Sequence, residues 1–177
     1  MHRTIEIPNG QKVTATFSKQ ELSNRLAKLR AHMADANVDA VVLTSYHNIN
    51  YFSDFVYCRF GRDYGLVVTQ DNYTTVTANI DGGQPFRRNQ LGDNVVYTDW
   101  QKGNFFVALQ NLIKPGSRIG VEYDHMPLAT MDIVKSSFPS SEFADIGVPT
   151  MHMRMIKSAE EIAVIKHGSR IGDIGGA

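Results

Sequence analysis

The sequence predicts an α/β fold, a mixed β-sheet of about six strands flanked by helices. Two observations support this prediction. Short apolar or β-branched runs alternate along the chain with segments of helical periodicity, which is typical of a sheet covered by helices. One pair of strands is joined directly by a tight turn, and such a hairpin makes the two strands antiparallel, so the sheet cannot be purely parallel.

The amino-terminal part predicts an arm followed by a long helix. Residues 5–17 alternate apolar and polar side chains around a Pro-Asn-Gly turn, which indicates a small hairpin or an extended arm. The first helix is predicted over residues 19–36. Ser18 and Glu21 have the spacing of a capping box there, and leucines then recur at helical spacing.

The middle of the chain contains short apolar runs bounded by turn residues. The run at 39–43 indicates a buried strand. β-rich runs at 64–69 and 74–77 flank the turn 70–73 and predict a hairpin. We further expect strands at 95–97, 118–122 and 142–144, helices at 105–112 and 128–138, and a connection at 146–155.

The last segment predicts a helix that begins near Ser158. Ser158 and Glu161 have capping-box spacing, and Ile162 and Ile165 then mark an apolar stripe. A stripe of this kind needs a partner that buries it. We therefore expect the helix either to pack back on the preceding domain or to belong to a larger protein.

Composition argues against several classes of function. Lys and Arg total 18, as do Asp and Glu, so the zero net charge favours neither a nucleic-acid partner nor an anionic membrane surface. No apolar run approaches the length of a membrane-spanning helix, and the amino terminus lacks a signal peptide's apolar core. Cys58 is the single cysteine, so no internal disulfide can form, and a reducing, cytoplasmic location is favoured.

The motifs that usually identify a chemistry are missing from the sequence. It has no glycine-rich dinucleotide or phosphate motif, no nucleophile elbow and no His-Glu-x-x-His. No two of the six histidines share metal-ligand spacing, so we expect no metal and no cofactor on this chain. Gly82-Gly83 follows an aspartate and predicts a sharp turn rather than a phosphate site.

The most unusual composition lies at residues 44–64, directly after the first buried strand, where α/β sheets commonly place their sites. Arg59 and Arg62 flank Phe60 on a glycine-containing loop. A guanidinium there could clamp a carboxylate bidentately while the ring packs on the ligand. The alternative interpretation places the arginines in solvent and the preceding aromatic rings in the core: Tyr51, Phe52 and Phe55.

Five segments carry a family resemblance: Ser45-Tyr-His-Asn-Ile-Asn-Tyr51, Cys58-x-Phe60-Gly61-Arg62, Ala78-Asn-Ile-Asp-Gly-Gly-Gln-Pro85, Val96-Tyr-Thr-Asp-Trp100 and Met153-Arg-Met-Ile-Lys-Ser-Ala-Glu-Glu161. They resemble the amino-terminal part of the creatinases. The last segment is shared with prolidases and Xaa-Pro aminopeptidases of the same pita-bread family and marks the junction into their catalytic domain. The resemblance implies a creatinase/prolidase amino-terminal domain with a ribonuclease H-like motif over residues 1–155. Residues 156–177 would then begin a truncated pita-bread domain.

The resemblance also implies a function. The longer protein would hydrolyse creatine to sarcosine and urea without a metal, as a head-to-tail homodimer. The family's catalytic residues would lie beyond Ala177, so this chain alone is expected to be inactive. It would supply Phe60 and Arg62 to the partner subunit's active site, where the arginine contacts the substrate carboxylate. Arg59 departs from the family pattern, which has a small polar residue there.

Two other interpretations stay open. The same domain could come from a proline-specific peptidase, in which it would govern the access of short peptides. A metal titration and a dipeptide assay on the longer protein would separate that reading from a creatinase. The chain could also be a stand-alone module that binds small carboxylates or a protein partner, and the sequence that follows Ala177 in the gene would test this.

Overall fold

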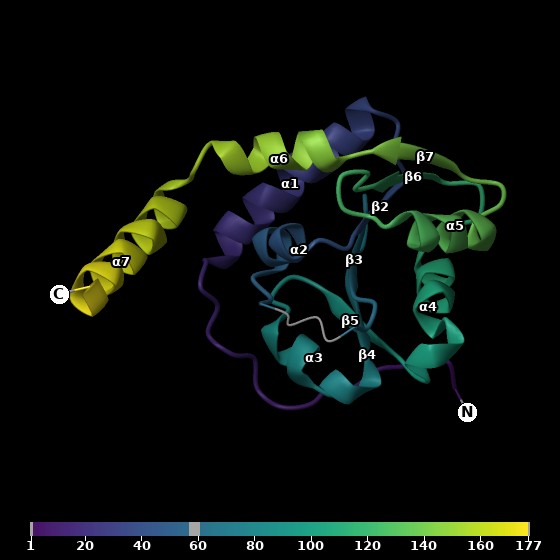
Figure 1. The fold of residues 1–177 in the computed structure, drawn as a ribbon, viewed down its shortest axis with the longest axis horizontal. Coiled ribbons are helices and arrows are strands. Elements are labelled where there is room, and N and C mark those ends of the chain that lie inside the picture. The colour runs from purple at the N-terminus through teal and green to yellow at the C-terminus, as the bar shows by residue number, and fades with distance from the viewer. Residues whose placement is uncertain (1, 57–60, 177) are drawn as a thin grey trace.

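The computed structural model describes residues 2–56 and 61–176, which form one mixed sheet with helices on both faces (Figure 1). The strands within these residues lie in the order β1-β5-β4-β3-β2-β6-β7. β3 is antiparallel to both β2 and β4, β1 is antiparallel to β5, and the other neighbours are parallel. Their bounds are β1 Thr4–Ile5, β2 Ala40–Leu43, β3 Gly65–Thr69, β4 Tyr73–Ala78, β5 Asp93–Tyr97, β6 Arg118–Val121 and β7 Glu142–Asp145.

Helices cover the sheet in two layers. In Figure 1, α1, α2 and α6 lie on one side of the sheet, and α4 and α5 lie on the other. The helices and short 3-10 turns are α1 Lys19–Asp35, α2 Tyr46–Ser53, η1 Asn79–Asp81, α3 Gln84–Arg88, η2 Trp100–Lys102, α4 Asn104–Leu112, α5 Leu128–Ser137, α6 Gly147–Met155 and α7 Ala159–Gly176.

The interior strand β2 shows why the core has two halves, one on each face of the sheet. Its side chains alternate between the faces of the sheet: Val41 and Leu43 belong to the apolar cluster under α1 and α2, whereas Ala40 and Val42 belong to the cluster under α4 and α5. All four are buried. A strand covered on both faces has no polar side, which is why it appears in the sequence as an unbroken apolar run.

The predicted α/β class, the mixed sheet and the β3–β4 hairpin are confirmed. The sheet has one strand more than the expected six among the described residues, because Thr4 and Ile5 pair with Tyr97 and Val96 of β5. The rest of the amino-terminal segment runs as an extended arm up to α1 and does not form a hairpin.

The connection predicted at 146–155 is wrong, because this segment contains the helix α6. Pro149 obscured the helical pattern, yet it occupies the third helical position, in the first turn, where a missing N–H breaks no intrahelical hydrogen bond. Helix α2 was also not predicted. It begins at Ser45, whose hydroxyl accepts a hydrogen bond from the Asn48 N–H at 3.3 Å.

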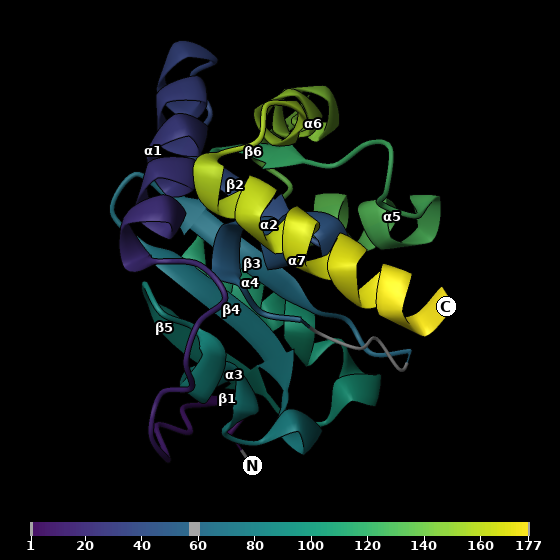
Figure 2. The same cartoon turned by 90° about the vertical axis from the view of Figure 1, so that its left-hand side faces the viewer.

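Helix α7 extends away from the rest of the molecule in Figure 1, and in Figure 2, where this side faces the viewer, it lies in front of the sheet. None of its described side chains is buried, and those of the predicted stripe stay largely accessible, with Ile162 43% and Ile165 56% exposed. Across the described residues, no helix combines the length and apolar character needed to cross a membrane.

Candidate functional site

The loop that carries Arg62 lies at the edge of the sheet where β2 ends. Leu43 at the end of β2 pairs with Leu66 near the start of β3, so the segment that joins these antiparallel strands returns to the same edge. The aromatic residues that precede the loop are buried, as the core interpretation predicted: Tyr51, Phe52 and Phe55. Phe60 and Arg59 lie outside the described residues, so of the predicted site residues the structure places Arg62 alone.

Arg62 forms an ion pair with Asp81, in which Nη2 lies 3.6 Å from Oδ1. The two side chains are only 15% and 19% exposed. Burial raises the pKa of Asp81, and the Arg62 charge opposes that shift. The structure thus brings together Arg62 and Asp81, which come from two of the segments that carry the resemblance and are separated along the chain by the whole β3–β4 hairpin.

The turn after Asp81 contains a backbone conformation that favours glycine. Gly82 has a φ of +55° and a ψ of −133°, a combination that a Cβ atom makes unfavourable. Gly83 has an accessible φ, but a Cβ there would lie 1.6 Å from Asn9 Oδ1 of the amino-terminal arm. The sharp turn expected at Gly82-Gly83 is therefore present, and the arm packs directly against it.

A buried carboxylate binds the segment that leads from β2 into α2. Glu122 is fully buried and accepts hydrogen bonds from the backbone N–H groups of Thr44 at 2.6 Å and Ser45 at 2.9 Å. It also accepts from the Ser45 hydroxyl and from Asn48 Nδ2 at 2.6 Å. These groups surround the amino terminus of α2, where a carboxylate is favourable. Glu122 therefore fixes α2 in place. Sequence reasoning missed this contact, because Glu122 is distant along the chain.

Two histidines meet near the same end of β2, but they do not form a metal site. The rings of His47 and His125 are 6.3 Å apart. Burial and the nearby charge of Arg154 lower the pKa of His47, which favours a neutral imidazole. Within residues 2–56 and 61–176, no group of three His, Cys, Asp or Glu side chains is placed to hold a metal ion.

A cavity of about 680 Å³ lies at the opposite end of the sheet. It is lined by the end of α1, the β3–β4 turn and the loop before β6, and its lining residues include Asn37, Gln70 and Lys114. Arg62 and Asp81 are not among the residues that line it. The Arg62–Asp81 pair therefore lies outside this cavity.

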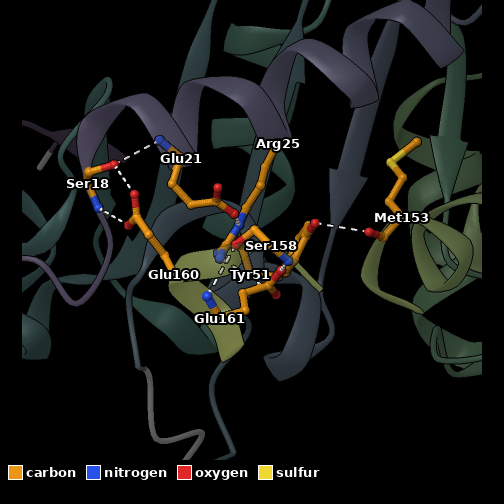
Figure 3. A network of polar contacts seen from close by, with 8 residues as sticks. All are labelled: Ser18, Glu21, Arg25, Tyr51, Met153, Ser158, Glu160 and Glu161. Carbon is orange, nitrogen blue, oxygen red and sulfur yellow. Dashed lines mark hydrogen bonds and ion pairs between the residues drawn. The ribbon is translucent and has the colours of Figure 1, made fainter. Parts of the chain in front are cut away.

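A second polar cluster joins the start of α7 to α1 (Figure 3). The Glu21 N–H donates to Ser18 Oγ at 3.1 Å, as the predicted capping box requires. The reciprocal contact comes from α7, because the Ser18 N–H donates to Glu160 Oε2 at 2.9 Å. The Ser158 box is complete: its N–H donates to Glu161 Oε2 at 2.8 Å, and the Glu161 N–H donates back to Ser158 Oγ at 3.2 Å.

Arg25 lies at the centre of this cluster and is 2% exposed. Its Nε donates to Glu21 Oε1 at 2.8 Å, its Nη1 donates to the Tyr51 carbonyl at 2.8 Å, and its Nη2 lies 3.6 Å from Glu161 Oε1. Its guanidinium also stacks over the rings of Phe17 at 4.0 Å and Tyr51 at 4.4 Å. One cation thus connects α1, α2 and the first turn of α7.

Comparisons with known proteins agree with this architecture. A sequence profile described as "Creatinase/Prolidase N-terminal domain" matches residues 25–156. A creatinase from Bacillus sp. (strain B-0618) is 50% identical over an alignment that covers the whole chain. The chain spans 44% of that relative's length.

Solved structures of lower identity show the same fold. The prolidase from Pyrococcus horikoshii OT3 superposes with a TM-score of 0.69 at 20% identity, over 85% of this chain and 40% of that one. The Creatinase/Prolidase N-terminal domain of an X-Pro dipeptidase from Streptococcus pyogenes gives 0.63 at 16% identity, over 73% of this chain and 97% of that one. From the profile match and the whole-chain identity, the chain belongs to the creatinase/prolidase N-terminal domain family.

Proposed function

We propose that this chain is the amino-terminal domain of a creatinase, an enzyme that hydrolyses creatine to sarcosine and urea. The observation that carries the proposal is the 50% identity to the Bacillus creatinase, whose alignment covers the Arg62 loop, the Asp81 turn and the Arg25 cluster. The prolidase structures are at most 21% identical and support the fold alone.

In this proposal the domain contributes to substrate binding and to assembly. Arg62 binds the carboxylate of creatine in the active site of a partner subunit, within a head-to-tail homodimer. A guanidinium suits this role, because its planar array of donors matches a carboxylate in shape and charge. Phe60 would pack on the same substrate, a role that rests on the sequence resemblance. Arg62 lies outside the 680 Å³ cavity of this chain, which is consistent with a residue that completes a pocket elsewhere.

The chain divides at the end of α6 in this proposal. Residues 1–155 form the amino-terminal domain, and residues 156–177 form the first helix of the pita-bread catalytic domain. The accessible stripe of α7 fits a helix that another part of the longer protein covers. The groups that hydrolyse creatine belong to that following domain, so this chain alone does not turn over substrate. We place the protein in the cytoplasm.

The test is urea release from creatine. It is measured for the 177-residue chain, for the longer protein that contains it, and for a buffer blank. We expect turnover by the longer protein without added metal, and none by the chain alone. Urea release by the chain above the blank would contradict the assignment of catalysis to the following domain. Metal-dependent cleavage of Xaa-Pro dipeptides by the longer protein, without urea release, would instead identify a proline-specific peptidase.

A further inference from the structure

We propose that Asp81 is a positioning residue that holds the Arg62 guanidinium in the orientation in which it receives the substrate carboxylate. This inference rests on the proposed role of Arg62 and adds a residue to it. The ion pair that motivates it has an Nη2 to Oδ1 separation of 3.6 Å.

The burial of this pair separates it from ordinary surface ion pairs. Arg62 is 15% and Asp81 19% exposed, whereas the side chains of the Arg118–Glu142 pair are 44% and 77% exposed. Water and salt therefore screen the Arg62–Asp81 pair much less than the exposed Arg118–Glu142 pair. A long arginine side chain on a loop has many rotamers, and a weakly screened carboxylate beside it favours those in which the two groups meet.

Asp81 lies on a turn that is fixed to the sheet. It is the last residue of η1, which directly follows the buried end of strand β4. The Gly82 N–H closes this turn by donating to the Asn79 carbonyl at 3.1 Å. A Cβ on the next residue, Gly83, would lie 1.6 Å from Oδ1 of Asn9, so the amino-terminal arm lies directly against the turn. A residue anchored to a strand can orient a functional side chain on a loop more precisely than the loop can alone.

The amino-terminal arm holds the same turn from outside. The Val13 N–H donates to the Arg87 carbonyl of α3 at 2.9 Å, and Lys12 Nζ donates to the Asn89 carbonyl at 2.9 Å. Helix α3 follows the Gly82-Gly83 turn directly, so the arm presses both α3 and the turn against the sheet. The segment that resembles the creatinases at 78–85 thus forms a fixed support, and Asp81 is its contact with the loop.

Pairing with Asp81 is compatible with binding a ligand. A guanidinium has five N–H donors on three nitrogens, more than a single carboxylate can occupy. A second carboxylate can therefore be bound by the same group. Asp81 would then restrict the orientation of Arg62 before the substrate arrives, which reduces the entropy lost on binding.

The test is a double-mutant cycle in the full-length protein, with creatine as the substrate. We expect Arg62→Ala to raise KM about ten- to a hundred-fold and Asp81→Ala to raise it about three- to twenty-fold, with kcat changed less. In the double variant KM should equal that of Arg62→Ala, because Asp81 acts only through Arg62. Asp81→Asn should lie between wild type and Asp81→Ala, since a neutral amide keeps the size of the side chain but attracts the guanidinium less than a carboxylate does.

Two controls separate positioning from a general loss of structure. Asp71→Ala removes an exposed carboxylate in the β3–β4 turn, at the other end of the sheet, and should leave KM unchanged. Creatine amide, a competitor without the carboxylate, should keep its inhibition constant in Asp81→Ala. If Asp81→Ala does not fold, Asp81→Asn replaces it, and KM for creatine and the inhibition constant of creatine amide are measured for that variant.

The outcomes distinguish this inference from the function on which it rests. If Arg62→Ala leaves KM unchanged, both the carboxylate-binding role and the inference fail. If Arg62→Ala raises KM but neither Asp81 variant does, the inference fails and the proposed function stands. Independent, multiplicative effects in the double variant would also overturn it, because Asp81 would then act through another group.

Discussion

Replacing Arg25 by alanine should cost this chain a large part of its stability. Arg25 is 2% exposed, and its removal leaves the mostly buried carboxylates of Glu21 and Glu161 without their shared cation. It also leaves the Tyr51 carbonyl without a donor. Removing one partner of a buried ion pair costs about 3–5 kcal/mol. Since a domain is typically stable by about 5–15 kcal/mol, this loss is a substantial fraction of the free energy of unfolding.

Urea unfolding, followed by circular dichroism, measures this loss directly from the shift in midpoint and the slope. Arg118→Ala is the matched control, because Arg118 pairs with Glu142 at 3.1 Å on the surface and should contribute only about 0–1 kcal/mol. Arg25→Lys keeps the charge but cannot contact two carboxylates and a carbonyl together, so it should recover part of the loss. If Arg25→Ala unfolds within about 1 kcal/mol of Arg118→Ala, the cluster does not have the strength argued for it.

Three further predictions concern single contacts. In the full-length protein, Arg62→Ala should raise KM for creatine strongly while the thermal midpoint changes little, and Arg62→Lys should recover only part; a change in kcat/KM of less than about twofold would refute the carboxylate contact. Hydrogen bonds from the Ser18 side chain and backbone hold the pKa of Glu160 below its usual 4.5, so its contribution to docking α7 is complete above that value and is lost as pH falls through the lowered pKa. An NMR titration should show this lowered pKa and its return towards 4.5 in Ser18→Ala; an unshifted Glu160 in the parent chain would contradict the contact. Gly83→Ala should cost at most about 1 kcal/mol, because the exposed Asn9 side chain can turn away from the added methyl group, and it should make the amino-terminal arm more susceptible to limited proteolysis. Adding Asn9→Gly should restore most of the loss, and a failure to do so would show that the overlap is not the cause.

The parts of the fold that depend on neighbouring residues were predictable from the sequence. Helix α1 shows its cap and its leucine spacing within a few residues, and the β3–β4 hairpin shows its turn between two β-rich runs. Helix α2 does not, because a histidine, two asparagines and aromatic residues are weak helix formers. Its position depends on Glu122, and no local pattern can indicate a contact with a residue so distant along the chain.

The candidate sites divide in the same way. The sequence marked Arg62 as unusual, and the resemblance gave it a role. Asp81 lay within a quoted segment, but nothing in the sequence indicated that it would meet Arg62. Part of the Arg25 cluster is predictable from the sequence, because the spacing identifies Ser18, Glu21 and Glu161 as capping residues. That Glu160 reaches Ser18 could not be read from spacing, since the reciprocal acceptor of a capping box normally lies on the same helix.

The contact between Ser18 and Glu160 affects where one cooperative folding unit ends and the next begins. The first helix of the amino-terminal domain receives its Ser18 N–H acceptor from Glu160, which lies beyond the proposed domain boundary. Shortening the chain to Met155 would leave that N–H to water and remove a carboxylate from the Arg25 cluster. In the intact longer protein, these contacts would contribute to the folding free energy of both domains. Unfolding of either domain should therefore destabilise the other. The proposed boundary lies at residue 155, whereas the units that unfold together would overlap by the first turn of α7.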